Sequence, residues 1–203
     1  ILPSEILILD CHYGHPRYRF PQRSEAFERL LHLVQESFNK KKIPIIFAEP
    51  IGITQELIVF FAGLSLKCRL HQSRYKITRT VFRHQGLPHN NFRLLQKRIA
   101  EDEIIILPPI LRGSSMIQSI KNRQSIVISG EVLTSQFKIL FPDAEGIALA
   151  SSADFSELVQ YVHISKPKQV FVIGRNADTF SHFLRKDGYH VWTLTRPEQL
   201  SLL

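Results

Sequence analysis

Cysteine, long apolar runs and internal repeats are scarce or absent in this sequence of 203 residues. The two cysteines, Cys11 and Cys68, are too few for a disulfide framework or a four-cysteine zinc site, and they are typical of a reducing compartment. No apolar stretch approaches the roughly 18 residues needed to cross a bilayer, so we expect no membrane partner. No signal-peptide pattern is present either. These absences predict a cytoplasmic protein, or a nuclear one if the source is eukaryotic.

The overall composition is that of a folded globular protein. Hydrophobic residues make up 44% and charged residues 22% of the chain, which excludes a disordered or collagen-like sequence. At roughly 100–200 residues per domain, the length allows one large domain or two small ones.

Acidic residues are missing from residues 57–100, although the chain as a whole contains 18 of them. The net charge of +8 therefore arises in this one stretch. Its nine cations are Lys67, Arg69, Arg74, Lys76, Arg79, Arg83, Arg93, Lys97 and Arg98. Such cations bind phosphate by releasing condensed counterions, and the interleaved rings of Tyr75, Phe82 and Phe92 could stack on bases. The stretch predicts binding to DNA or RNA; the alternative is a solvated basic face that serves solubility alone.

Short apolar runs alternate with segments of helical spacing, which predicts an α/β fold with mostly parallel sheets. The expected strands cover residues 6–9, 43–48, 104–107, 125–130, 137–141, 146–150, 169–173 and 190–194. The expected helices cover residues 24–39, 55–64, 76–85, 92–100, 155–164 and 177–186.

A polar cluster follows the first expected strand, at the position where open α/β sheets place ligand sites. It reads Asp10-Cys11-His12-Tyr13-Gly14-His15. Asp10, His12 and His15 could face a metal ion. Histidines at a strand end are more often hydrogen-bonded surface groups, so both interpretations stay open.

Several motifs resemble those of the β-CASP branch of metallo-β-lactamase-fold nucleases. The segment from Asp10 to Pro16 resembles the family signature Asp/Glu-x-Thr-Tyr-Gly-x-Pro, and the segment from Gly52 to Leu57 is similar to Gly-x-x-Gln-Glu-Leu. Further matches follow in the family's order at residues 107–109, 128–130, 152–158, 166–171 and 180–188. The resemblance covers nearly the whole chain and is closest to the DNA-ligase-associated exonucleases.

This resemblance implies an α/β protein with a β-CASP domain plus the C-terminal strands and helices of a metallo-β-lactamase fold. Residues 1–21 would hold a strand and the acid motif of that fold, residues 22–145 the β-CASP-like domain, and residues 146–203 the C-terminal part. The family consists of two-zinc phosphodiesterases, in which the metals generate hydroxide and clamp the scissile phosphate. Besides DNA or RNA, it implies a DNA ligase or an active nuclease subunit as a partner.

The sequence departs from the family at its metal-binding positions. Ser152 stands where the family motif Ser-Asp-His-Ala-Asp has histidine, and Gly174 falls on a later family histidine. Neither is a good zinc ligand. The family's principal zinc motif, His-x-His-x-Asp-His, belongs to an N-terminal half and does not occur in this chain. We therefore expect no cofactor in this chain, and zinc only if an upstream half is present.

Two residues of the family site remain, Asp10 and Asp154, and Arg175 lies beside a lost histidine. Asp10 is either a relic that orients a loop or a working metal ligand, and we favour the relic. Asp154 is either a catalytic acid or the N-cap of a helix, and we favour the cap. Arg175 could bind a backbone phosphate where a metal once balanced its charge, or it could be a solvated surface residue.

Two functional hypotheses follow from these residues. The first is a catalytically degenerate, nucleic-acid-binding portion of a nuclease-like protein that acts in DNA processing or repair. The alternative is a fragment of an active zinc-dependent DNA or RNA exonuclease whose metal-binding half lies elsewhere.

Overall fold

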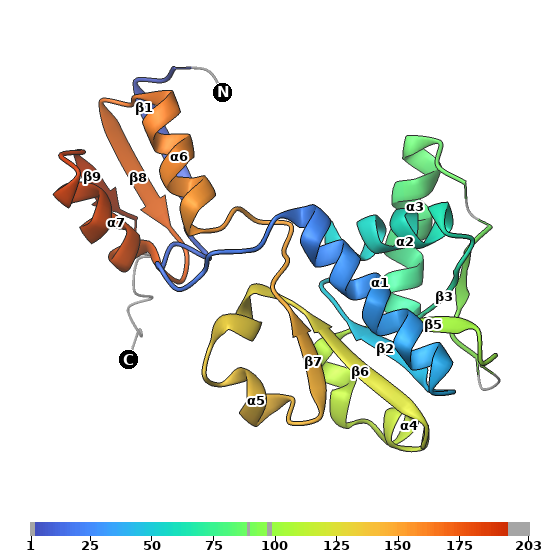
Figure 1. Cartoon of the computed structure of the whole chain (residues 1–203). Coiled ribbons are helices and arrows are strands. Elements are labelled where there is room, and N and C mark those ends of the chain that lie inside the picture. Colours follow the sequence, from blue (N-terminus) through green and yellow to red (C-terminus); the bar gives the residue numbers. More distant parts are fainter. Residues whose placement is uncertain (1–2, 89, 97–98, 195–203) are drawn as a thin grey trace, which may run out of the picture. The chain divides into compact units, whose positions relative to one another are not determined.

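The chain forms two units, each built on a parallel β-sheet (Figure 1). The structure is a computed structural model, and it describes residues 3–88, 90–96 and 99–194. The central unit is Phe20–Ser151, and the end unit combines Ile1–Arg19 with Ser152–Leu203. Within the described residues, no helix is both long enough and apolar enough to span a membrane.

The central unit contains a six-stranded sheet in the order β4-β3-β5-β2-β6-β7, with every neighbouring pair parallel. The strands are β2 (Ile43–Phe47), β3 (Lys67–Leu70), β4 (Phe92–Leu94), β5 (Glu103–Leu107), β6 (Arg123–Ile128) and β7 (Ala144–Ile147). All five residues of β5 are buried. The four consecutive Ile and Leu residues that follow Glu103 are what a strand covered on both faces requires.

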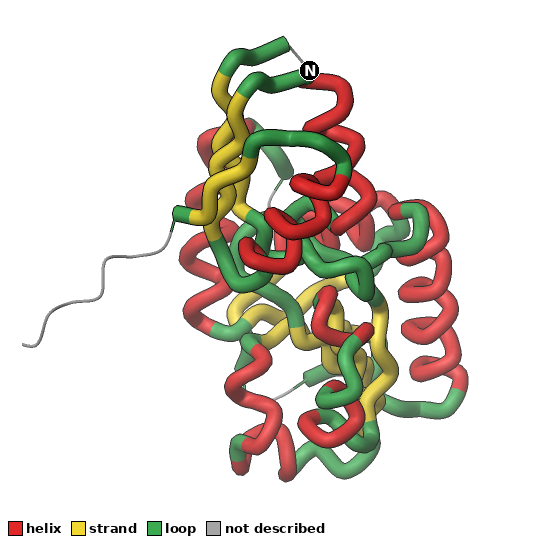
Figure 2. The backbone as a smooth tube through the Cα atoms, turned by 90° about the vertical axis from the view of Figure 1, so that its left-hand side faces the viewer, coloured by secondary structure: helices red, strands yellow, loops and turns green. Residues whose placement is uncertain are grey.

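Helices cover both faces of the central sheet. On one face, α1 (Arg23–Asn39), α2 (Ile53–Gly63) and α3 (Gln72–Gln85) share a core with Ile46 and Ile104. On the other face, the short helices α4 (Ser115–Gln118) and α5 (Phe137–Leu140) share a core with Ile45 and Ile105. Two 3₁₀ turns, Pro109–Gly113 and Gly130–Leu133, precede these short helices. Figure 2 shows helices on both sides of these strands.

The end unit contains a smaller parallel sheet in the order β1-β8-β9. Its strands are β1 (Ile6–Asp10), β8 (Gln169–Ile173) and β9 (Val191–Thr193), and its helices are α6 (Phe155–Ser165) and α7 (Ala177–Lys186). Both helices pack on the same face, where Leu7, Val170 and Val172 meet Leu158 and Phe180 (Figure 1). The chain therefore joins its first strand to its last two strands in one core.

The predicted α/β class with parallel sheets is confirmed, whereas three local predictions were wrong. The apolar run at residues 137–141 is the helix α5, not a strand; only Phe137 of its four residues is buried, and one helical turn can bury a single side chain in this way. The segment predicted as a helix at residues 92–100 begins instead with strand β4. Strand β3 was missed, because two of its four residues are cations.

Candidate functional site

Helix α3 carries a cationic stripe on the face opposite its buried side. Lys76, Arg79 and Arg83 are spaced by three and four residues, so they share one face of the helix, and all three are exposed. The residues Arg74, Thr78 and Phe82 are buried on the other side. At about 100° per residue, the centres of the two sets lie roughly 130° apart around the helix axis. Among the described residues, no acidic group forms an ion pair with these three cations. We call Lys76, Arg79 and Arg83 the α3 stripe.

Both ends of α3 are fixed by local interactions. The His71 side chain accepts a hydrogen bond from the Ser73 amide at the N-terminus, and Gly86 ends the helix in the left-handed conformation. Arg83 and His84 lie in the last turn, where positive charge is favoured by the helix dipole. The stripe is therefore presented on a rigid element.

Of the six other predicted cations of the central unit, two are exposed, two have protein partners and two lie outside the described residues. Lys67 and Arg93 are exposed, at the start of β3 and on the edge strand β4. Arg69 and Arg74, by contrast, have protein partners. Lys97 and Arg98 lie outside the described residues. The exposed cations of α3 are therefore the largest group of predicted cations that the structure places on one surface.

Arg69 and Arg74 are largely buried, and each has a protein partner that accepts hydrogen bonds from it. Arg69 pairs with the carboxylate of Glu103 at 2.8 Å, and both side chains are largely buried. Burial raises the pKa of Glu103, but hydrogen bonds from Arg69 and the Ala100 amide outweigh burial and hold that pKa below its usual range. Arg74 is only 8% exposed and donates to the Ala48 carbonyl at 3.2 Å. Burial lowers the pKa of Arg74, while nearby Glu49 opposes that shift.

The aromatic residues of the basic stretch belong to the core. Phe82 and Phe92 are 1% and 4% exposed, with ring centroids 5.1 Å apart, and Tyr75 packs edge-on against Phe92. The expectation that these rings could stack on bases was wrong for Phe82 and Phe92, which are buried, while Tyr75 is half-buried. Their regular spacing among cations reflects the inner side of α3 and its contact with β4.

In the end unit, Asp10 lies exposed at the carboxyl end of β1, paired in register with Ile173 of β8. Gly174 follows directly, with φ of +98°, and a Cβ there would collide with Asp10 Oδ1. A histidine at position 174, as in the family motif, would be strained by the positive φ and would require the Asp10 carboxylate to shift. Arg175, the next residue, is exposed in the same loop, in a different unit from the other predicted cations.

Asp154 is the N-cap of α6, as predicted. Its Oδ1 accepts a hydrogen bond from the Glu157 amide at 2.8 Å, and Glu157 Oε2 accepts one from the Asp154 amide at 2.9 Å. This reciprocal capping box uses the buried carboxylate of Asp154 to satisfy the start of the helix. Ser152, two residues earlier, is exposed.

The histidines of the first polar cluster take part in local contacts. His15 accepts hydrogen bonds from the backbone amide and the Nε of Arg17, at 3.1 and 3.2 Å. Burial first, and the charge of Arg17 second, lower the pKa of His15. Tyr13 is buried against Tyr18 in the same turn. Among the described residues, no group of three or more His, Cys, Asp or Glu side chains is arranged to hold a metal ion.

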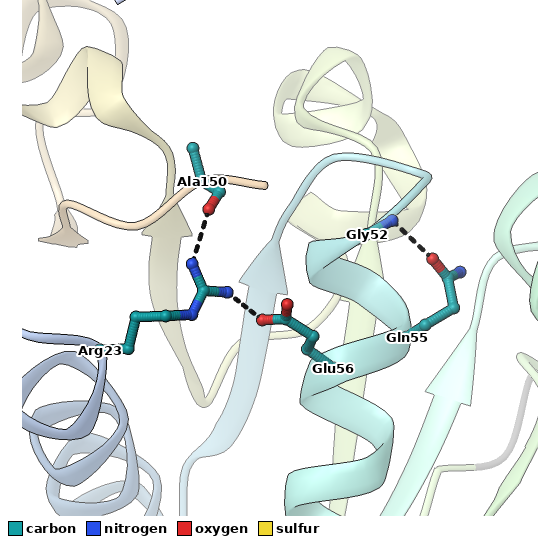
Figure 3. Close-up of polar contacts among 5 residues, drawn as sticks. All are labelled: Arg23, Gly52, Gln55, Glu56 and Ala150. Carbon is teal, nitrogen blue, oxygen red and sulfur yellow. Dashed lines mark hydrogen bonds and ion pairs between the residues drawn. The ribbon is translucent and has the colours of Figure 1, made fainter. Parts of the chain in front are cut away.

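The Gly-x-x-Gln-Glu-Leu segment organises the start of α2 (Figure 3). Gln55 Oε1 accepts from the Gly52 amide at 2.8 Å, and its Nε2 donates to Thr78 Oγ1 on α3 at 2.9 Å. Glu56 pairs with Arg23, which also donates to the Ala150 carbonyl at 3.0 Å. The motif thus joins α1, α2, α3 and the segment after β7. The sequence alone did not reveal Arg23 or Thr78, because both act across long sequence separations.

Comparison with family models finds no match for this chain. The chain is similar to a probable DNA ligase of Opitutus terrae, with 24% identity over 199 residues. The match covers 98% of this chain but 20% of the ligase, so the chain spans about a fifth of that relative's length. The resemblance to β-CASP nucleases stays a prediction.

Proposed function

We propose that this chain is a nucleic-acid-binding, non-catalytic β-CASP-like portion of a DNA-processing protein. The α3 stripe is the observation that carries this proposal: three exposed cations on one face of a well-capped helix, within 44 residues that contain no acidic group. Exposed Lys67 and Arg93 on the neighbouring strands β3 and β4 add to the positive charge of this part of the central unit.

The chemistry of the surface favours the phosphate backbone over the bases. Arginine and lysine at helical spacing can each contact a phosphate, while the rings of Phe82 and Phe92 are buried in the core and cannot stack on bases. Binding through such a surface depends on charge and depends little on sequence. We infer an interface that holds nucleic acid without selecting a particular base sequence.

The similarity to a probable DNA ligase supports DNA over RNA as the ligand. It also supports a ligase as a functional neighbour, either in the same polypeptide or as a partner. In such an arrangement, a module that binds the DNA phosphate backbone would raise the local concentration of DNA at the catalytic centre of the ligase.

The non-catalytic part of the proposal rests on the residues at the former metal positions. Gly174 offers no side chain and Ser152 is a poor zinc ligand. The carboxylate of Asp154 is engaged in capping α6, and the space beside Gly174 is filled by Asp10. These residues do not fit a two-zinc centre, so we derive no hydrolytic step from them.

A charge-neutralisation experiment tests the binding surface. Replacing Lys76, Arg79 and Arg83 with glutamine should weaken binding to a fluorescent DNA duplex by at least about tenfold at low salt, measured by anisotropy. The matched control replaces three exposed cations elsewhere, Lys41, Lys121 and Lys186, and removes the same total charge. Equal weakening by both triple variants would contradict a defined surface on α3, and chelator-sensitive degradation of the DNA would contradict a non-catalytic role.

A further inference from the structure

A pocket of about 460 Å³ lies on the α4 and α5 side of the central sheet. It is formed by the first residues of β6 and β7, the turn Pro109–Gly113 and the segment that follows α5. Pockets that bind small molecules typically measure about 300–1,000 Å³. We call it the β6 pocket, and its size is that of a site for a small ligand.

The β6 pocket brings three cations together. Arg112, Lys121 and Arg123 line it, along with the exposed carboxylate of Asp143. Among the residues that the structure describes, none of these three cations forms an ion pair. The four groups together carry a formal charge of +2. A ligand with about two negative charges, such as a phosphate monoester near pH 7, would relieve the repulsion among the cations.

The two arginines of the pocket are held in place by contacts that leave their charge available. The Arg112 guanidinium lies over the ring of Phe141, 5.1 Å from its centroid. Arg123 is half-buried and donates through Nη1 to the Ile120 carbonyl at 2.8 Å. A guanidinium has five N–H donors, so this one hydrogen bond leaves others that can bind an anion. Such planar groups bind phosphate through two parallel hydrogen bonds.

Strand β6 places a hydroxyl beside these cations. Side chains alternate along a strand, so Arg123 and Ser125 lie on the same side of the sheet as Val127, which belongs to the core under α4 and α5. Ser125 lines the pocket, and its hydroxyl can donate to an anion oxygen. Leu140 and Phe141 add an apolar wall. Apolar walls with a few converging polar groups are typical of sites for small ligands.

We propose that the β6 pocket binds a small phosphate monoester that carries a flat apolar group. The phosphate accepts hydrogen bonds from Arg112, Arg123 and Ser125, and the apolar group packs against the wall. A DNA duplex fits this site less well, because its phosphates follow one another along a convex surface whereas these cations line a concave one. The inference is independent of the proposed nucleic-acid surface, since α3 packs on the opposite face of the central sheet.

Calorimetric titration of the chain with two probes, inorganic phosphate and phenyl phosphate, tests this proposal. Both probes should bind, and phenyl phosphate should bind at least about threefold more tightly because its ring meets the apolar wall. Arg112→Gln and Arg123→Gln should each weaken the binding of both probes by at least about tenfold. Circular dichroism shows whether each variant is folded, and the exposed Arg112 carries the test if Arg123→Gln is not.

Arg29→Gln is the matched control, because Arg29 is exposed on α1, against the opposite face of the sheet. It should leave the affinity for both probes unchanged, and an excess of DNA duplex should not displace phenyl phosphate. Failure of both probes to bind at millimolar concentration, or equal weakening by the control, would overturn the proposal. Equal affinity for the two probes would overturn the role of the apolar wall, and displacement by DNA would overturn the proposal in favour of a second nucleic-acid surface.

Discussion

The central and end units both contain parallel sheets, but they differ in how many faces those sheets have covered. In the central unit, Ile45 and Ile46 face opposite sides and both are fully buried, because helices lie on each side. In the end unit, Leu7 is buried and its neighbour Ile8 is exposed. Short apolar strands therefore have both faces buried in the central unit and only one face buried in the end unit.

This difference bears on function. Both faces of the central sheet are covered by helices, so the exposed features of the central unit, above all the α3 stripe, can be interpreted as binding features. The end unit, by contrast, exposes apolar side chains of its regular strands, among them Ile8 and Trp192.

The largest expected effect comes from matched isoleucine substitutions in the two sheets. Ile105→Ala in β5 should lower the free energy of unfolding by about 2–5 kcal/mol, because Ile105 is fully buried. Ile8→Ala in the isolated chain should change it by less than about 0.5 kcal/mol. Urea unfolding is followed by circular dichroism, which reports the helices of both units, and by the fluorescence of Trp192, the single tryptophan, which reports the end unit.

Leu184→Ala provides the control within the end unit. Leu184 is fully buried beneath the covered face, so this variant should shift the Trp192 transition, by about 2–5 kcal/mol. A comparable loss from Ile8→Ala in the isolated chain would remove the distinction between the two faces.

An intermediate loss of stability is expected from substitutions at the carboxyl end of the end-unit sheet. Gly174→Ala should cost about 2–3 kcal/mol, because position 174 has positive φ and a Cβ there collides with Asp10. Gly188→Ala shares the positive φ but meets no atom within 4 Å, so it should cost only about 1 kcal/mol. Trp192 fluorescence in urea measures both. If Asp10→Ala in the Gly174→Ala background restores no stability, the collision is not the cause.

The smallest expected change in stability occurs only at acidic pH and concerns two ion pairs. The pKa of Glu103 is lowered in the folded chain, so its pair with Arg69 stabilises the central unit above the unfolded-state pKa, and this contribution is lost as the pH falls through the folded-state pKa. Glu103→Gln should flatten this acid dependence of the urea midpoint. Glu5→Gln, which breaks the exposed pair with Lys168, should leave the midpoint unchanged at every pH. Equal responses of the two variants would contradict the difference in burial.

Local signals in the sequence predicted much of the fold. Helix α7 and strand β8 match their predicted bounds, and both Gly86 and Asp154 cap helices as expected. These elements depend on hydrophobic periodicity and on side-chain to backbone bonds within a few residues. Strand β3 was missed because Arg69 is neutralised by Glu103, a partner 34 residues away.

The candidate site was harder to predict, because it too depends on contacts between residues that are far apart in the sequence. The count of cations in residues 57–100 indicated a basic surface, but it could not separate exposed Arg79 from Arg74, which donates to the carbonyl of Ala48. Likewise, the spacing of Phe82 and Phe92 does not reveal that they contact each other. Tertiary contacts decide which charges and rings are available to a ligand.

The salt dependence of DNA binding tests the central claim most directly. Anisotropy titrations of a DNA duplex at several salt concentrations give the slope of the logarithm of the association constant against the logarithm of the salt concentration. Each lost phosphate contact should reduce the magnitude of this slope by about 0.9, so glutamine at Lys76, Arg79 and Arg83 together should reduce it by about 2.7. An unchanged slope in that variant would show that the α3 stripe does not bind DNA.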